Sequence, residues 1–160
     1  MSALLEVSGI AFAYESNVVL KSVGFSANPA EFVALLGLNG AGKSTMLDIM
    51  AGLRSADSGA VRVDGRDIKQ WQARDRARWI SHLPQGIRSD LPFTVEQIVL
   101  MGRYAHADEW FESQEDVQHA VRAMESMQCL AYRHRSYYTL SGGERQRVLL
   151  AACLALTCPD

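Results

Sequence analysis

Nine consecutive residues near position 40 have the types and the spacing needed to bind a phosphate group. Residues 37–45 read Gly-Leu-Asn-Gly-Ala-Gly-Lys-Ser-Thr and fit the pattern G-x-x-x-x-G-K-[ST] at every fixed position. Glycines let the backbone curl around an anion with its N–H groups pointing inward, and a helix N-terminus adds a positive dipole end. The alternative is an ordinary glycine-rich turn with an incidental lysine, but such a turn has no need to match every fixed position of this pattern. The predicted binding residues are Gly37, Asn39, Gly40, Ala41, Gly42, Lys43, Ser44 and Thr45.

The polar side chains of this segment, which we call the phosphate loop, suggest a division of labour. Lys43 supplies a mobile positive charge for the β- and γ-phosphates and is the predicted catalytic residue of the loop. The Ser44 hydroxyl is suited to bind the Mg²⁺ that bridges them, and Thr45 supports it. The loop alone predicts phosphate binding and does not identify the nucleotide.

The elements around the loop predict an α/β fold. The apolar run at residues 32–36 is typical of a buried parallel strand that leads into the loop, and residues 43–51 are expected to form the helix that follows it. Short strands are predicted for an N-terminal antiparallel layer at residues 4–8, 18–20 and 23–26. A further strand at residues 60–63, followed by Asp64 and Gly65, is expected to enter a tight hairpin and rejoin that layer.

The pattern becomes helical in the second half of the chain. Residues 72–78 are predicted as a short charged helix, and residues 79–83 as an apolar strand stopped by Pro84, which favours parallel pairing in the core. Two helices are then expected. One opens at a capping box formed by Thr94 and Gln97 and runs to Met101, and the other has Ser113 as its N-cap and apolar residues at Val117, Ala120, Val121 and Met124.

A second glycine pair lies at residues 140–144, Leu-Ser-Gly-Gly-Glu, before a long apolar helix. Two interpretations are open. Ser141 and Glu144 are three residues apart and form a capping box that needs no ligand. Alternatively, Ser141 and the amides of Gly142 and Gly143 form a second anion site at a helix N-terminus, with no side chain to block a phosphate. The presence of the phosphate loop upstream favours the second interpretation, an anion site.

Composition limits the possible partners. Sixteen lysine and arginine residues against eighteen acidic ones give a net charge of −2, so we expect no nucleic-acid partner. The N-terminus shows no secretory signal, and the most apolar segment, residues 148–158, is too short to span a bilayer and is predicted as a buried helix. The three cysteines and four histidines have no metal-ligand spacing. These features indicate one cytosolic domain.

Together these motifs resemble the ATP-binding cassette (ABC) family of ATPases. Residues 37–45 look like its Walker A loop, and residues 140–144 with the following Arg-Gln-Arg match its signature motif. The resemblance implies a P-loop NTPase fold with ATP and Mg²⁺ as ligands, and it places Ser141, Gly142, Gly143 and Glu144 of the signature among the ATP-binding residues. It also implies that Gln85 senses Mg²⁺, the γ-phosphate and the attacking water, and that Tyr14 stacks on adenine. By spacing alone, Gln85 is a loop glutamine and Tyr14 a strand aromatic.

A finer likeness lies at residues 93–106, where T-V-x-x-I-V-L-x-G-R-x-x-H is similar to importers of iron-siderophores, haem or cobalamin. The alternative is an amphipathic helix whose apolar residues simply pack inward. The resemblance implies a head-to-tail dimer, in which the signature of one copy faces ATP held by the other. It also implies transmembrane permease partners, indirect work with a binding protein, and a position on the inner face of the bacterial cell membrane.

Departures from the family pattern predict a partial domain. Ala30 stands where glycine is usual, Leu38 replaces a common proline, and the apolar strand ending in Asp-Glu that the family carries after residues 158–160 is not in this sequence. We expect a core at residues 1–89, a helical insertion at 90–138 and the signature with its helix at 139–160, incomplete at the C-terminus. Such a chain would bind ATP and hydrolyse it poorly. The alternatives are a soluble ABC protein outside transport and a non-catalytic nucleotide-binding fragment.

Overall fold

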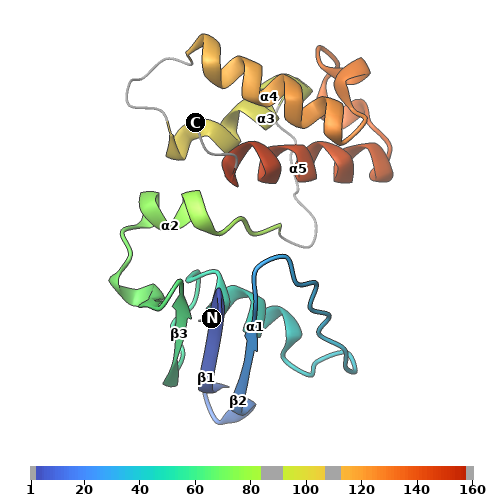
Figure 1. The fold of residues 1–160 in the computed structure, drawn as a ribbon. Helices are drawn as coiled ribbons and strands as arrows, with labels where there is room; N and C mark the ends of the chain where they lie inside the picture. Colours follow the sequence, from blue (N-terminus) through green and yellow to red (C-terminus); the bar gives the residue numbers. More distant parts are fainter. Residues whose placement is uncertain (1–2, 84–91, 107–112, 158–160) are drawn as a thin grey trace. The chain divides into compact units, whose positions relative to one another are not determined.

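The computed structural model describes residues 3–83, 92–106 and 113–157, and the chain divides into two compact units. The first unit, Met1–Gln72, contains a four-stranded sheet and one α-helix, and the second, Ala73–Asp160, is helical in its described part (Figure 1). The phosphate loop belongs to the first unit and the signature segment to the second.

The sheet of the first unit is wholly antiparallel and is built on one long hairpin. Strand β1, Leu5–Tyr14, pairs with β2, Asn17–Ala27, so the predicted layer is confirmed but its strands are longer than expected. The polar positions that seemed to break the strands are accommodated as irregularities in the ladder, because Gly9 and Ser22 take positive φ angles of 59° and 52°. Cross-strand pairing therefore overrides the local breaks.

The predicted second hairpin is also confirmed. Strand β3, Ser58–Val63, pairs antiparallel with β1 and turns into β4, Arg66–Asp67, through Asp64 and Gly65, which have φ angles of 48° and 75°. Positive φ at both turn residues matches the twist of a tight hairpin. The strand order is β2-β1-β3-β4, and the 3₁₀ turn η1, Ile68–Gln70, follows.

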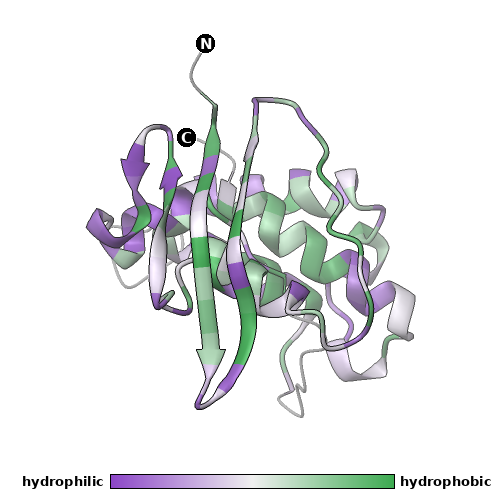
Figure 2. Cartoon of the chain, turned by 90° about the horizontal axis from the view of Figure 1, so that it is seen from below, coloured by the Kyte–Doolittle hydropathy of each residue, from purple (hydrophilic) through white to green (hydrophobic). Residues whose placement is uncertain are grey.

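The core of the first unit combines the inward side chains of the sheet with helix α1, Lys43–Met50. Figure 2 shows green apolar residues alternating with paler ones along β1, the strand that starts at the labelled N-terminus. The buried side chains of β1 are Val7, Ile10 and Phe12, and the irregularity at Gly9 shifts the alternation by one residue between the first two. The buried apolar residues of this unit are Val7, Ile10, Phe12, Leu20, Met46, Ile49, Ala51, Val61, Val63 and Ile68.

The prediction of a buried parallel strand at residues 32–36 was wrong for the described structure. These residues carry no strand, and the side chains of Phe32 and Leu36 are 93% and 91% exposed. An extended apolar segment becomes a buried strand only when neighbouring strands satisfy its backbone and cover both faces. Among the described residues no strand pairs with it, so the parallel pairing predicted for the core is not observed there.

The predicted strand at residues 79–83 was wrong as well. Helix α2, Ala73–Trp79, confirms the predicted charged helix but extends into the supposed strand, and the Ile80 amide still donates to the Arg76 carbonyl at 2.9 Å. Trp79 is half-exposed rather than buried in a sheet. The local helical bonding continues because no described strand offers residues 79–83 a ladder.

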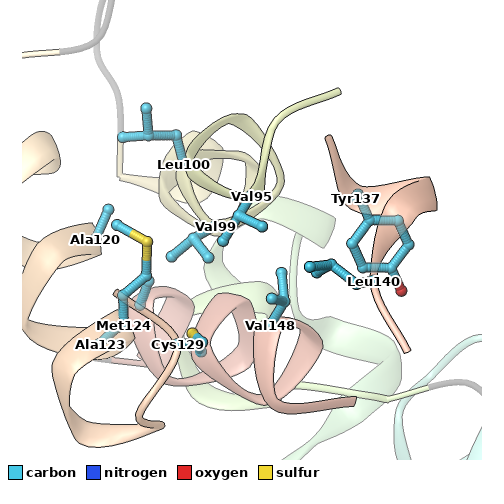
Figure 3. Packing of buried hydrophobic residues seen from close by; sticks show 12 residues of the cluster. Val95, Val99, Leu100, Ala120, Ala123, Met124, Cys129, Tyr137, Leu140 and Val148 are labelled. Carbon is cyan, nitrogen blue, oxygen red and sulfur yellow. The ribbon is translucent and has the colours of Figure 1, made fainter. Parts of the chain in front are cut away.

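The second unit packs three helices around one apolar core: α3, Val95–Met101; α4, Gln114–Ser126; and α5, Gly142–Thr157. Short 3₁₀ turns connect them: η2, Gly102–Ala105; η3, Leu130–Tyr132; and η4, Tyr137–Thr139. Figure 3 shows side chains from these helices meeting around Val99, Met124 and Val148. The predicted buried helix near the C-terminus is thus confirmed, with Val148, Ala151 and Ala155 fully buried.

Both predicted helix starts are confirmed in detail. Thr94 and Gln97 form a reciprocal capping box at α3, and Ser113 forms one with Asp116 at α4. Each box satisfies two backbone N–H groups that the first turn leaves without a partner. The boundaries proposed from sequence at residues 89/90 and 138/139 stay predictions.

Candidate phosphate-binding site

The backbone of the phosphate loop is shaped by two glycines in the left-handed region. Gly40 and Gly42 have φ angles of 83° and 85°, and Gly42 is the N-cap of α1. A Cβ on Gly42 would lie 2.7 Å from Val19 Cγ1 and 2.9 Å from Leu20 Cδ2, whereas one on Gly40 would meet nothing within 4 Å. Glycine is therefore required at position 42 both for its backbone conformation and because a side chain would clash with β2, whereas the space beside Gly40 is open.

Lys43 closes the loop from inside. Its ammonium group donates to the carbonyl oxygens of Gly37 and Leu38 at 2.8 Å and 2.7 Å, and the Ala41 amide donates to the Leu38 oxygen at 3.2 Å. Two of the three ammonium N–H groups thus hold the curled backbone. The positive charge is placed within the ring of the loop and at the start of α1, where an anion is favoured.

The hydroxyls after the lysine differ in exposure. Ser44 is exposed and its hydroxyl is therefore accessible to a metal ion, while Thr45 is buried and its Oγ1 lies 3.4 Å from the Tyr14 hydroxyl. Asn39 and Ala41 are exposed on the loop. The structure therefore brings Tyr14 and every predicted residue of the phosphate loop together around the N-terminus of α1.

Tyr14 presents an aromatic ring beside the loop. The ring is 45% exposed, meets the Phe12 ring edge-on at 4.9 Å, and has the Arg54 guanidinium carbon 5.0 Å from its centroid. Arg54 also lies 5.3 Å from the Phe12 centroid, so one cation contacts both rings. Sequence reasoning missed Arg54, because no spacing rule links a residue after α1 to the end of β1.

The predicted second anion site lies at the start of α5. The carboxylate of Glu144 accepts from the Ser141 amide at 2.7 Å, the Glu144 amide donates to Ser141 Oγ at 3.4 Å, and bonding to Ser141 lowers the pKa of Glu144. The capping box is therefore confirmed. Gly142 and Gly143 are exposed, and an added Cβ on either would meet nothing within 4 Å, so their backbone is accessible to a ligand.

The remaining predicted site residue, Gln85, lies outside the described residues. Within residues 3–83, 92–106 and 113–157 there is no group of three or more histidine, cysteine or acidic side chains placed to hold a metal ion. No helix in the same ranges is both long and apolar enough to cross a membrane.

A glycine loop that is curled around its own lysine, opens a helix and lies beside an exposed aromatic ring defines a phosphate-loop nucleotide-binding protein. The sequence profile of the family described as "ABC transporter" matches residues 20–159. The chain therefore belongs to the ABC transporter family.

Relatives with curated names support this assignment. The chain is 39% identical over 156 residues to the hemin import ATP-binding protein HmuV of Pseudomonas entomophila (strain L48), covering 98% of this chain and 60% of that protein. It is 37% identical over 155 residues to the cobalamin import ATP-binding protein BtuD of Halobacterium salinarum, covering 97% of this chain and 39% of that protein.

Solved structures confirm the fold. A metal-chelate type ABC transporter in an inward-facing conformation superposes with a TM-score of 0.82 at 31% identity, covering 99% of this chain and 58% of that one. The P-loop ABC cassette fold predicted from the sequence is thus confirmed, even though the described sheet contains only antiparallel pairs. The chain spans 60% or less of the length of these relatives.

Proposed function

We propose that this chain is the ATP-binding, energy-coupling part of an ABC importer for iron-siderophore, haem or cobalamin. The observation that carries the proposal is the Lys43 ammonium held at 2.8 Å and 2.7 Å by two carbonyls of the phosphate loop, at the start of α1. The importer class is supported by the hemin and cobalamin import proteins to which the chain is similar.

The residues present fit a nucleoside triphosphate with Mg²⁺. The loop offers backbone N–H groups around Gly40, where nothing would touch even an added Cβ, and the ammonium of Lys43 for phosphate oxygens. Ser44 offers an exposed hydroxyl to Mg²⁺, and Gln85 is proposed as a further ligand. Mg²⁺, when bound, neutralises charge on the β- and γ-phosphates. Tyr14 offers an exposed ring for adenine.

The partners follow from the proposed function. A second copy would bring Ser141, Gly142 and Gly143 to the phosphates held by residues 37–45 of the first, in a head-to-tail dimer. Transmembrane permease subunits would receive the resulting motion through the Gln85 segment, and a substrate-binding protein would act indirectly. The protein would then lie on the cytoplasmic face of the cell membrane, without a nucleic-acid partner.

For residues 1–160 alone we propose ATP binding with poor hydrolysis. Phosphoryl transfer depends in part on a metal ion that is coordinated from two sides. The phosphate loop supplies a ligand on one of these sides. Steady-state hydrolysis by residues 1–160 at the rate of the intact protein would contradict this part of the proposal.

The transport proposal is tested in cells that carry the intact protein. Lys43→Ala should abolish ATP-dependent uptake of the metal chelate and leave the protein bound to its permease in a pull-down. Lys21→Ala, an exposed lysine on β2, is the matched control and should leave uptake unchanged. An intact protein that binds no permease would instead support a soluble ABC protein. Uptake that is indifferent to Lys43→Ala would support a non-catalytic role.

A further inference from the structure

The turn η2 lies directly on the backbone of α5 in the second unit. A Cβ on Gly102 would come within 2.3 Å of the Ala152 carbonyl oxygen, a distance that no side chain tolerates. Glycine is therefore required here for close approach of two backbones. The next residues of the same turn, which the phosphate chemistry does not use, are thereby brought to the last turn of the helix.

Two side chains from this turn satisfy the end of α5. The last four carbonyls of a helix have no partner within it. Arg103 Nη1 donates to the Ala155 carbonyl at 3.0 Å, and His106 Nε2 lies 2.6 Å from the Leu156 carbonyl oxygen. A carbonyl only accepts, so Nε2 carries the hydrogen. A cation at this position also complements the negative end of the helix dipole.

Arg103 is held in place by a buried ion pair. Its side chain is 2% exposed, and its Nε donates at 3.0 Å to Oδ1 of Asp116 on α4, whose side chain is 9% exposed. Because the guanidinium is planar and its N–H groups are fixed in a fork, the bond to Asp116 directs Nη1 toward Ala155. Helices α4 and α5 are thus joined through one side chain.

The opposite side of the turn is held by α2. Arg74 and Arg78 both donate from Nε to the Ala105 carbonyl, at 3.0 Å and 2.9 Å. The turn that carries Arg103 and His106 is therefore bonded to three helices, and it cannot shift without breaking several hydrogen bonds. This makes it a rigid anchor for the end of α5.

We propose that Arg103 and His106 are positioning residues for the signature segment. The 16-residue helix α5 is about 24 Å long and begins with Gly142 and Gly143. Because α5 is one continuous helix, the bonds that hold its last turn also fix the direction of its first turn. The inference rests on the proposed function, in which this first turn faces ATP held by a second copy. Loss of the anchor should impair the reaction that needs two copies and spare binding of ATP to the phosphate loop of one.

The test uses the intact protein with a pair of matched variants. His106→Leu removes the donor to Leu156, whereas His106→Gln keeps an N–H that can donate to it. We expect His106→Leu to lower kcat for ATP hydrolysis roughly tenfold or more, since small misplacements have large catalytic effects. The Kd for ATP should stay within about twofold, and His106→Gln should restore most of kcat. If His106 served only the stability of the fold, His106→Leu would not lower kcat while leaving the Kd for ATP unchanged, and His106→Gln would not selectively restore kcat.

A second variant removes both members of the buried ion pair. Arg103→Met combined with Asp116→Asn removes both charges and the bond to Ala155, and it should lower kcat in the same way. If this double variant does not fold, the His106 pair decides. If hydrolysis depends on Lys43 but is unchanged in the His106 and Arg103/Asp116 variants, the positioning role is overturned and the proposed function is not. A parent protein without Lys43-dependent hydrolysis would overturn the proposed function, and this inference with it.

Discussion

The substitution Asp116→Asn is predicted to destabilise the helical unit strongly. Asp116 pairs with Arg103 at 3.0 Å, and their side chains are 9% and 2% exposed. The substitution removes the negative charge of Asp116 from beside this buried guanidinium. Removing one partner of a buried pair costs roughly 3–5 kcal/mol, which raises the opening equilibrium of α4 about a hundredfold to several thousandfold.

Hydrogen exchange of the intact protein, followed by mass spectrometry, measures this opening directly. Peptides from α4 and α5 should lose protection, while peptides from β1 and β2 serve as the internal control. The double variant Arg103→Met with Asp116→Asn should lose less than Asp116→Asn alone, because it also removes the buried positive charge of Arg103. A change of less than about 0.5 kcal/mol in the protection of α4, or a greater loss in the double variant than in Asp116→Asn, would refute the prediction.

Four further outcomes are expected. Gly42→Ala should lower the melting temperature of the intact protein more than Gly40→Ala, because both have positive φ but only the first meets β2; equal shifts would contradict this. Tyr14→Ala should weaken ATP binding by roughly 1–3 kcal/mol in a calorimetric titration, and Tyr14→Phe should not. Burial raises the pKa of Asp116, but hydrogen bonds from Ser113 and Arg103 outweigh this effect and hold the pKa below its usual value. The ionised carboxylate therefore contributes its full stabilisation of the folded state above about pH 4, and this contribution is lost as pH falls through the lower folded-state pKa. The urea midpoints of the parent and Asp116→Asn should therefore converge in acid, and a constant gap would count against the assignment. Ser141→Ala should destabilise the start of α5 by about 0.5–2 kcal/mol, measured by exchange of its first amides, and unchanged exchange would refute the cap.

Features encoded within a few consecutive residues were predictable from the sequence. The phosphate loop, the hairpin turn at Asp64 and Gly65, and the cap formed by Thr94 and Gln97 are all present as expected. Each depends on a local requirement, such as a positive φ or a donor three residues away, that the sequence states directly.

Features that depend on distant partners were not predictable. The apolar run at residues 32–36 has the composition of a buried strand, but that outcome needs pairing strands, and none is described beside it. The contact of Arg54 with Tyr14 and the ion pair of Arg103 with Asp116 join residues that no periodicity relates. An arginine in a sequence reads as a surface charge until the fold shows what surrounds it.

The most direct test of the central claim is calorimetric titration of ATP with Mg²⁺ into the intact protein and its Lys43→Ala variant. We expect the unsubstituted protein to bind the nucleotide and Lys43→Ala to lose at least about tenfold in affinity, since the charge that holds the loop and is proposed to contact the phosphates is gone. Lys21→Ala should bind like the parent. Binding by Lys43→Ala within about twofold of the parent would contradict the claim that residues 37–45 form the nucleotide site.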